Sequence, residues 1–244
     1  MVYCPARSGW PLAPDPMPAL SLLIDADDTL WENNVFFETA FSEFVKLLDH
    51  STMTAGQIQV VLDEIELKSI QTDGYGSRNF GRNMQWCFRR LTERPWTQQD
   101  LRAVMAVAER ILEHPLELFD GVEETLACLA GRHELTLYSK GHLEEQHAKI
   151  GRSGLRGYFA DCLVVAEKDT AGYRYFVEEN GLDRDRTWMI GNSPKSDINP
   201  ALRAGLGAVL VPHPRTWSLE HEDVPEPSER FQVVERFSDL KELF

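Results

Sequence analysis

The chain alternates short apolar runs with longer amphipathic segments. Runs of about 4–8 apolar residues without polar alternation predict strands buried on both faces. They occur at 19–25, 134–139, 161–166, 187–191 and 207–211, with a weaker candidate at 230–235. Helical patterns separate them at 121–132, 142–151, 171–181 and 196–205. Strands that alternate with helices in this way predict an α/β fold with a doubly wound parallel sheet.

One stretch breaks this alternation. It contains helical patterns and no predicted strand, at 35–50, 54–70, 77–91 and 97–114. Thr54 and Thr97 open two of these patterns as N-cap residues. We therefore expect an α-helical subdomain over 33–115, inserted into a core made of 19–32 and 116–244.

Two further segments have a different character. Residues 1–18 contain five prolines, one arginine and no apolar run, which predicts a disordered extension rather than a signal peptide. Residues 213–230 are rich in Pro, Glu and His and are expected to form a surface loop. No apolar run approaches the ~18 residues that a membrane span needs.

Composition narrows the possible partners. The 244 residues, 43% hydrophobic and 26% charged, suit one core domain with an insert. The formal charge is 25 − 39 = −14, which argues against nucleic-acid or anionic-membrane binding. A small anionic substrate remains possible, because a metal and a few bases can reverse the field inside one cleft. The four cysteines (Cys4, Cys87, Cys128 and Cys162) form no CxxC motif, which favours a reduced cytoplasmic protein.

Acidic residues follow the first predicted strand directly, in the string DADDTL at 25–30. Ligands of open α/β sheets bind beyond the carboxyl ends of the strands, so these carboxylates lie where a site is expected. Asp25 and Asp27 can divide the labour of nucleophile and general acid/base. The alternative is a polar turn in which Asp28 and Thr29 cap the following element.

Other known motifs with closely spaced aspartates fit the chain less well. A calcium-binding EF-hand loop would need Gly and Glu at its sixth and twelfth positions, where the chain has Leu30 and Phe36. The chain also lacks the GxxxxGK[ST] loop of nucleotide hydrolases. A metal-binding DxD of the glycosyltransferase type fits the string alone, but no downstream feature supports it.

Later predicted strands also end in polar residues. Ser139 and Lys140 end one strand, where a hydroxyl and backbone N–H groups can hold phosphate oxygens, or Ser139 can simply cap a helix. Lys168 follows another strand and can neutralise a transferring phosphoryl group, although an isolated lysine is more often a surface residue. Asp197 opens a later helix as a metal ligand or a cap.

These strand ends together resemble the four motifs of the haloacid dehalogenase-like (HAD) hydrolase superfamily. The resemblance covers about residues 20–212 and rests on DADDTL, Ser139, Lys168 and the string GNSPKSD at 191–197, in that order. The helical insert falls where that family places its α-helical cap, between the first and second motifs. The resemblance implies a Rossmann-like HAD core and a phosphatase with an inserted α-helical cap.

The resemblance also implies a role for each matching position. Asp25 would be the nucleophile that forms an aspartyl-phosphate, and Asp27 would protonate the leaving alcohol and then activate water. Lys168 would neutralise charge at the nucleophile. The expected phosphate-binding residues are Thr29, which also braces the motif, Ser139 and Lys140. The expected cofactor is Mg²⁺, with the ligands Asp25, Asp27 (through its main-chain carbonyl), Asn192 and Asp197.

Two positions depart from the family pattern. The fourth motif usually reads Gly-Asp, and here Asn192 replaces that acid. An amide oxygen can still bind Mg²⁺, but one negative charge is lost, which predicts an active site with weaker metal affinity. The third motif often has Pro after its lysine, and here Asp169 follows Lys168.

Substrate selection is expected to come from the cap. The stretch 72–86 combines glycines, arginines, asparagines and aromatic residues. Arg78, Asn79, Arg82 and Asn83 can face the cleft and bind a carboxylate, a second phosphate or sugar hydroxyls. The alternative is a helix start with solvated arginines. The segment 31–34, just after the nucleophile, is a second candidate.

The sequence therefore predicts a Mg²⁺-dependent phosphomonoesterase that acts on a small soluble phosphorylated metabolite. Dehalogenase or phosphonatase chemistry on the same fold is disfavoured, because Asp27 is present and no extra lysine nucleophile is evident in the cap. Asn192 leaves open a catalytically weakened, ligand-binding relative. A receiver-type signalling domain uses similar residue types but is far shorter and has no cap. The sequence makes no prediction of the particular substrate or of the oligomeric state.

Overall fold

The computed structural model describes residues 19–244, and the extension predicted at 1–18 lies outside the described residues. Six strands form one sheet in the order β3-β2-β1-β4-β5-β6. Every neighbouring pair is parallel. The strands are β1 (Ser21–Ile24), β2 (Glu134–Lys140), β3 (Asp161–Val165), β4 (Thr187–Gly191), β5 (Gly207–Leu210) and β6 (Phe231–Val233). The predicted α/β class and the parallel, doubly wound sheet are confirmed.

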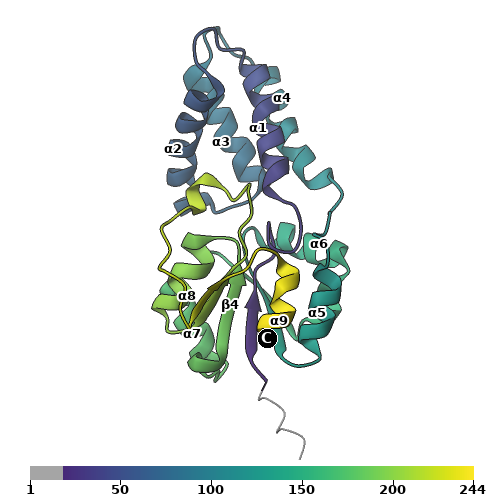
Figure 1. Ribbon diagram of the computed structural model, residues 1–244. Helices are drawn as coiled ribbons and strands as arrows, with labels where there is room; N and C mark the ends of the chain where they lie inside the picture. The colour runs from purple at the N-terminus through teal and green to yellow at the C-terminus, as the bar shows by residue number, and fades with distance from the viewer. Residues whose placement is uncertain (1–18) are drawn as a thin grey trace, which may run out of the picture.

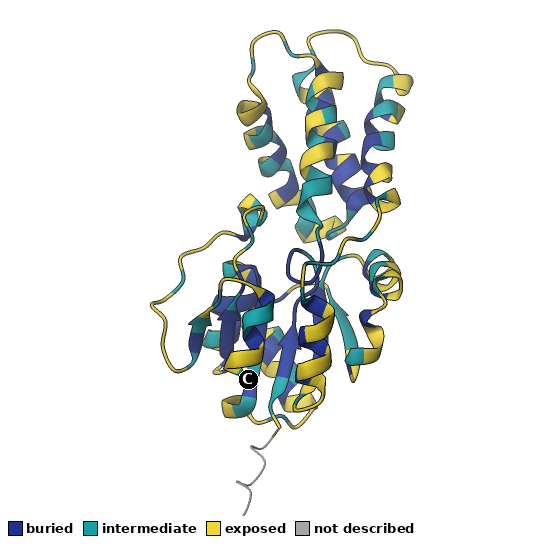
Figure 2. Ribbon diagram, turned by 45° about the vertical axis from the view of Figure 1, so that its right-hand side comes forward, coloured by how far each residue is buried: buried dark blue, intermediate teal, exposed yellow. Residues whose placement is uncertain are grey.

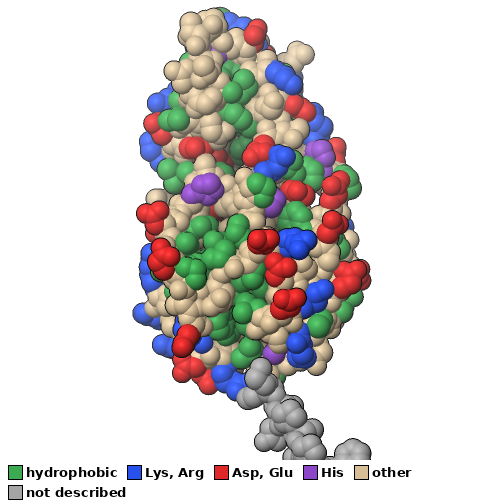
Figure 3. All heavy atoms as spheres, viewed as in Figure 1, with side chains coloured by type: hydrophobic (Ala, Val, Ile, Leu, Met, Phe, Trp, Pro, Cys, Tyr) green, Lys and Arg blue, Asp and Glu red, His purple; other side chains and the backbone are tan. Residues whose placement is uncertain are grey.

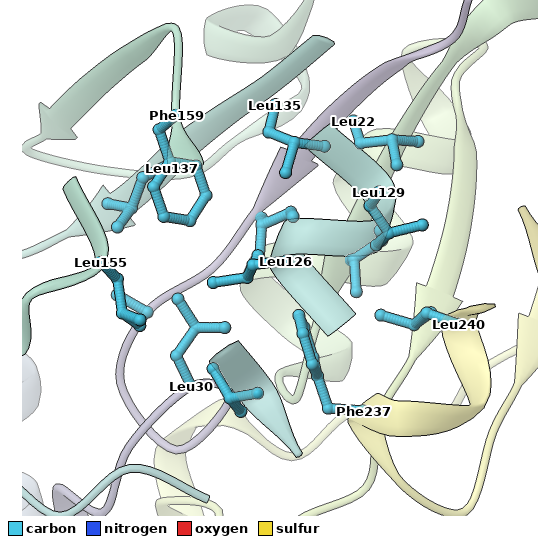
Figure 4. Packing of buried hydrophobic residues seen from close by; sticks show 14 of the residues in the cluster. Leu22, Leu30, Leu126, Leu129, Leu135, Leu137, Leu155, Phe159, Phe237 and Leu240 are labelled. Carbon is cyan, nitrogen blue, oxygen red and sulfur yellow. The ribbon is translucent and has the colours of Figure 1, made fainter. Parts of the chain in front are cut away.

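Helices cover both faces of this sheet, as the continuous apolar strands require. In β1, Leu22 and Ile24 point to one face, where they pack with residues of α5 (Val122–Ala130) such as Leu126. The α6 helix (Leu143–Ser153) and the C-terminal α9 (Leu240–Leu243) also contribute to that cluster, part of which Figure 4 shows. Leu23 points to the other face, under α7 (Thr170–Glu179) and α8 (Asn199–Arg203). The alternation of a strand's side chains thus sorts one apolar run into two cores.

Four helices lie between β1 and α5 in the chain, and we call them the helical insert: α1 (Asn34–Leu48), α2 (Ala55–Asp73), α3 (Ser77–Leu91) and α4 (Gln98–Glu109). Figure 1 shows them on one side of the body that contains the sheet, beyond the ends of the strands. They enclose a hydrophobic cluster of their own, which includes Phe44, Leu62 and Phe88. Their buried faces turn toward one another in Figure 2.

The two N-cap residues predicted in the insert are confirmed. The side chains of Thr54 and Thr97 cap α2 and α4, and each forms a reciprocal capping box with the third helical residue. The division into a core (19–32 and 116–244) and a cap (33–115) stays a prediction, because it depends on whether the two parts fold and move as separate units. The element order itself places an all-helical segment between the first and second strands.

Three observations bear on charge, redox state and membranes. On the face shown in Figure 3, Lys and Arg side chains are interspersed with Asp and Glu rather than gathered in a patch. Cys87, Cys128 and Cys162, the cysteines within the described residues, are free thiols. Within residues 19–244, no helix combines the length and the apolar character that crossing a membrane requires.

Candidate active site

The turn after β1 is held by its own side chains. Asp25 continues the sheet, since its N–H donates to the carbonyl of Ile190 on β4 (2.9 Å). Asp28 adopts a left-handed conformation (φ 59°), which Asp tolerates better than most residues. Its carboxylate accepts hydrogen bonds from the N–H groups of Asn33 (2.9 Å) and Asn34 (3.0 Å). Asp28 therefore stabilises the turn, and it lines the cavity beyond the strand ends together with Asp25 and Asp27.

Three charged side chains meet beyond the ends of three parallel strands. Lys168 follows β3 and lies between Asp25, which follows β1, and Asp197, which lies in the short helical turn Pro194–Ile198 after β4. Its Nζ is 2.5 Å from Asp25 Oδ1 and 2.8 Å from Asp197 Oδ1. Lys168 is 3% exposed and Asp197 1%, so water contributes little screening here. Gly191 permits this arrangement, because a side chain there would clash with the Asp197 carboxylate.

Burial and mutual attraction set the charges of this cluster. Burial alone would lower the pKa of Lys168, but Asp197 and Asp25 raise it, so the ammonium group stays charged. Burial raises the pKa of Asp197, and Asp25 adds to this, although Lys168 acts in the opposite direction. Two carboxylates share one ammonium group, so a bound cation would favour the ionised form of both carboxylates.

Thr29 and Asn192 form a small hydrogen-bonded group with Asp25. The Thr29 hydroxyl donates to Asp25 Oδ2 (3.0 Å) and lies 3.3 Å from Asn192 Oδ1. The Asn192 N–H donates to the Thr29 hydroxyl (3.1 Å), and its side-chain amide donates to Thr216 Oγ1 (3.0 Å). The structure thus places Thr29 at Asp25, in the bracing position, and does not bring it to the cavity wall.

Asp27 is surrounded by donors. Lys149 Nζ lies 2.6 and 2.5 Å from its two carboxylate oxygens, and Gln146 and Trp31 each donate to it at 2.8 Å. Burial would raise the pKa of Asp27, but Lys149, Gln146 and Trp31 together lower it. The carboxyl is therefore held ionised. Gln146 and Lys149 are three residues apart on α6, so one face of that helix supplies two of the donors.

Ser139 and Lys140, both predicted to bind phosphate, have different surroundings. Ser139 is buried, does not line the cavity, and its hydroxyl has no hydrogen-bond partner among the described residues. Lys140 lines the cavity, but its Nζ already contacts Ser196 Oγ (2.7 Å) and Glu220 Oε1 (2.7 Å). The structure does not present Lys140 as a free phosphate ligand.

Glu220 corrects the expectation that 213–230 is simply a surface loop. It is 8% exposed and accepts hydrogen bonds from Ser193 (2.6 Å) and Ser196, in addition to its ion pair with Lys140. Residues 216–218 of the same loop line the cavity. The polar composition of residues 213–230 suggested exposure to solvent. Glu220 is buried instead, because both of its carboxylate oxygens have hydrogen-bond partners in the protein.

Glu220→Gln is expected to lower the free energy of unfolding at pH 7 by about 3 kcal/mol, because Lys140 would lose its buried partner. Burial would raise the pKa of Glu220, but Lys140 and the two serine hydroxyls lower it below its ordinary value of 4.5. The stabilisation is therefore present above about pH 4.5 and is lost as the pH falls through the lower, folded pKa.

Urea denaturation at several pH values measures this effect. The gap between wild type and Glu220→Gln should narrow below about pH 4.5, whereas the exposed control Glu222→Gln should show little loss at pH 7. An equal gap at all pH values would contradict the ion-pair explanation.

A cavity of about 430 Å³ joins the strand ends to the helical insert. Of the predicted site residues, its walls contain Asp25, Asp27, Lys140, Lys168, Asn192, Asp197, Asn79 and Asn83, together with Asn33 and Asn34 of the segment after the nucleophile.

The prediction that Arg78 and Arg82 face the cleft is not met. Both are exposed, neither lines the cavity, and Arg82 pairs with Asp73 (3.5 Å). The solvated-arginine alternative therefore describes these two residues.

The donor chemistry at the strand ends fits Mg²⁺, which prefers oxygen ligands. Asp25, Asp27, Asn192 and Asp197 all line one cavity, and a bound cation would favour the ionised form of the carboxylates around Lys168. A second set of possible ligands, Asp28, Glu32 and His213, has atoms within 4.8 Å of one another. This second set includes a histidine nitrogen, whereas the first set offers only the oxygen ligands that Mg²⁺ prefers, so the first set is the better fit.

Comparison with known families agrees with this geometry. Residues 23–211 match the family described as haloacid dehalogenase-like hydrolase. The chain therefore belongs to the haloacid dehalogenase-like hydrolases. Its parallel α/β sheet, four-helix insert and acidic strand ends are the structure of a hydrolase of that family.

Two similar proteins are named as a nucleotidase and a phosphatase. The chain is 27% identical to pyrimidine 5′-nucleotidase YjjG of Escherichia coli over 130 residues, which are 50% of this chain and 55% of that enzyme. It is 23% identical to glyceraldehyde 3-phosphate phosphatase of Methanothermobacter thermautotrophicus over 91% of this chain and 98% of that enzyme.

Solved structures share the fold. A haloacid dehalogenase-like hydrolase from Xanthomonas campestris has a TM-score of 0.80 and 28% identity, covering 93% of this chain and 94% of that one. A 2-haloacid dehalogenase from Pseudomonas syringae has a TM-score of 0.58 and 20% identity, covering 92% and 97%.

Proposed function

We propose that this hydrolase is a Mg²⁺-dependent phosphomonoesterase that acts on a small phosphorylated metabolite through an aspartyl-phosphate on Asp25. The observation that carries the proposal is the position of Asp25 in the wall of the cavity, with one oxygen held by Lys168 and the other by Thr29. Phosphoryl transfer asks mainly for positioning and charge neutralisation, which these contacts supply. Two curated relatives are named as a nucleotidase and a phosphatase.

In the first step, a carboxylate oxygen of Asp25 attacks the phosphorus atom, and the bond from phosphorus to the ester oxygen breaks. Lys168 holds its ammonium group beside that carboxylate and lowers the repulsion between two anions. The buried Ser139 hydroxyl, which has no partner within the described residues, is an available donor near the same strand ends. The protonated Asp27 carboxyl gives its proton to the departing ester oxygen, so the products of this step are the phosphorylated Asp25, the ionised Asp27 and the free alcohol.

In the second step, a water molecule attacks the phosphorus of the acyl phosphate, which releases inorganic phosphate and regenerates Asp25. Asp27 takes the proton of this water, for which its carboxyl must be ionised, as Lys149, Gln146 and Trp31 hold it; the pKa that they lower makes it a weak base while Lys149 stays in contact. Its earlier role as proton donor to the leaving alcohol requires a proton on the same carboxyl. Lys149 opposes that protonation, so we propose that substrate displaces Lys149 from Asp27 before the first step.

The residues proposed to hold Mg²⁺ are Asp25, the main-chain carbonyl of Asp27, Asn192 and Asp197. When bound, the ion would neutralise the phosphoryl oxygens and favour the ionised form of the carboxylates. The helical insert would act as the cap that covers this site, with 33–115 as its extent.

The chief alternative is dehalogenase chemistry on the same fold, since haloacid dehalogenases share it. Asp27 favours the phosphatase, because it supplies the proton-transfer group that a phosphate ester needs. Phosphonatase chemistry is disfavoured further, because the lysines among the described cavity residues (Lys140, Lys149 and Lys168) all come from the core and not from the insert.

The experiment that tests this proposal compares two substrate classes on the purified protein. We expect Mg²⁺-dependent release of inorganic phosphate from phosphorylated metabolites, abolished by EDTA, and no halide release from 2-haloacids. Halide release without phosphate release would favour the dehalogenase. Ligand binding with no turnover of either class would favour the catalytically weakened relative that Asn192 suggests.

Asn192→Asp is expected to lower the half-saturating Mg²⁺ concentration roughly tenfold, because one added charge beside a cation is worth at least ~1 kcal/mol. Thr216 would have to turn its proton toward the new carboxylate, since Asn192 now donates to it. Titration of activity against Mg²⁺ measures the change. If both the Mg²⁺ dependence and the turnover stayed the same, the idea of a charge deficit at this position would be wrong.

A further inference from the structure

The far end of the cavity is built by three helices of the insert, and each contributes one stripe. Phe37 and Phe41 come from α1, at a spacing of one helical turn. Gln59, Glu66 and Ile70 come from α2, and Asn79, Phe80 and Asn83 come from α3. Aromatic and aliphatic side chains thus alternate with a few amide and carboxyl groups, which is typical of a pocket that orients one ligand.

Glu66 is the unusual member of this wall. It is 6% exposed, and its Oε2 has no hydrogen-bond partner within residues 19–244. Buried carboxyls nearly always have partners in folded proteins, so an unpartnered one in a cavity wall calls for an explanation. Burial, with a smaller effect of Asp63, raises the pKa of Glu66 to about 8. At pH 7 the carboxyl is therefore mostly neutral and offers one O–H donor and one carbonyl acceptor.

The charges of the cavity differ between its two ends. The core contributes Lys140, Lys149 and Lys168 at the strand ends. The described residues of the insert that line the cavity include no Lys or Arg, whereas they include Glu38 and Glu66. A second phosphate or a carboxylate at the far end would find no Lys or Arg among the described lining residues of the insert and would face a buried carboxyl.

Asn79 and Asn83 complete the polar part of this wall. Both are buried on α3, four residues apart and therefore on one face of the helix. The Asn79 amide nitrogen donates to Ser69 Oγ (2.9 Å) and to the Gly74 carbonyl (2.6 Å). Those bonds fix the orientation of Asn79, whose carbonyl oxygen accepts one long hydrogen bond from Arg82 (3.5 Å) and keeps capacity to accept a second.

We propose that Glu66, with Asn79 and Asn83, recognises a neutral, planar amide-type group at the end of the substrate opposite the phosphate. Such a group places an N–H donor beside an acceptor and matches the donor and acceptor of the Glu66 carboxyl. Phe37, Phe41 and Phe80 supply flat apolar surface for the same planar group. The proposal rests on the proposed phosphomonoesterase, because it assigns the alcohol part of that enzyme's substrate.

A panel of aryl phosphates that differ only at the para position tests this assignment. The esters are 4-carbamoylphenyl, 4-carboxyphenyl, 4-(aminomethyl)phenyl and phenyl phosphate, assayed with Mg²⁺. The amide ester should have the highest kcat/KM, about tenfold above phenyl phosphate, which corresponds to one or two net hydrogen bonds. A preference for the carboxylate or the ammonium ester would overturn the proposal.

Variants at Glu66 separate recognition from general damage to the insert. Glu66→Leu should remove the preference for the amide ester, whereas Glu66→Gln, which keeps a donor and an acceptor, should retain it. Glu64→Gln is the matched control, because Glu64 lies exposed on the same helix and pairs with Arg90. Comparing the ratio of amide ester to phenyl phosphate between variants cancels the intrinsic reactivity of the esters, which is the same for every variant. Retention of the preference in Glu66→Leu would overturn the proposal.

A binding measurement distinguishes this proposal from the catalytic one. Titration calorimetry with 4-hydroxybenzamide and with phenol needs no hydrolysis and no phosphate. Wild type and Glu66→Gln should bind the benzamide about tenfold more tightly than phenol. Equal affinities would overturn the recognition site even if phosphatase activity were present. Tighter benzamide binding with no phosphate release from any ester would support the site while the phosphatase proposal fails.

Discussion

Asp25→Asn is expected to reduce kcat for phosphate release by ~10⁴-fold or more, as removal of a nucleophile from a concerted catalytic unit does in well-studied hydrolases. An amide cannot form the acyl phosphate, so the reaction loses its first step rather than a fraction of its rate. The fold should survive the change, because Lys168 keeps its contact with Asp197 (2.8 Å) and Thr29 can still donate to the amide oxygen. Steady-state kinetics with Mg²⁺ measure the loss.

The neighbouring Asp28→Asn provides a matched control for this variant. Asp28 anchors the turn through backbone N–H groups and adopts a left-handed conformation that Asn also tolerates. Asp28→Asn should therefore keep most of the activity that Asp25→Asn loses. Turnover of Asp25→Asn close to that of wild type would refute Asp25 as the nucleophile.

Lys168→Met is expected to have the second largest effect and to act on stability as well as on activity. Removing one partner of a buried ion pair costs about 3–5 kcal/mol, because the other charge is left without compensation. Here two carboxylates, Asp25 and Asp197, would lose the same ammonium group. The free energy of unfolding from urea denaturation should fall by about that amount, and phosphate release should be lost.

Two comparisons separate this effect from the general cost of removing a lysine. Lys195→Met removes an exposed lysine that bonds a loop carbonyl, and its stability should stay close to that of wild type. Adding Asp197→Asn to Lys168→Met should restore part of the lost stability, since one of the two orphaned charges disappears. An unchanged unfolding midpoint in Lys168→Met would contradict the stabilising role of the ion pairs from Lys168 to Asp25 and Asp197.

Much of the site could be predicted from the chain because parallel strands converge. Each strand that ends in a polar residue delivers it to the same edge of the sheet, so Asp25, Lys168, Asn192 and Asp197 had to lie close together once the strands were recognised. The same reasoning located the helical insert, because four helical patterns in succession leave no strand to extend the sheet.

Helix faces and returning loops could not be predicted in this way. Each residue turns an α-helix by about 100°, so Asn79 and Asn83 reach the cavity while Arg78 and Arg82, one position earlier, point to solvent. The sequence of α3 carries polar residues on both sides and does not say which side is buried.

The surroundings of three further residues depend on contacts between segments far apart in the chain, which the sequence does not reveal. Lys149 lies far from Asp27 in the chain, and only the packing of α6 brings the two together. Glu220 is buried because the loop after β5 returns over Lys140 and two serines. Glu66 belongs to a helix with a mixed pattern, and its isolation is visible only when the cavity around it is known.

The net charge of −14 also has a more specific meaning in the structure. Acidic residues gather with lysines at the strand ends, where a phosphate ester and a divalent cation are proposed to bind. The opposite end of the same cavity offers no lysine or arginine among the described residues. A substrate with one anionic end and one uncharged, hydrogen-bonding end matches this distribution.

The central claim, a phosphoryl group carried by Asp25, can be tested by one trapping measurement. Wild-type protein is mixed with phenyl phosphate and Mg²⁺, quenched in acid during turnover, digested and analysed by mass spectrometry. We expect a peptide containing Asp25 with the added mass of one phosphoryl group, which disappears when substrate is exhausted and never forms in Asp25→Asn. Turnover without this peptide, or a phosphoryl group on another residue, would contradict the account.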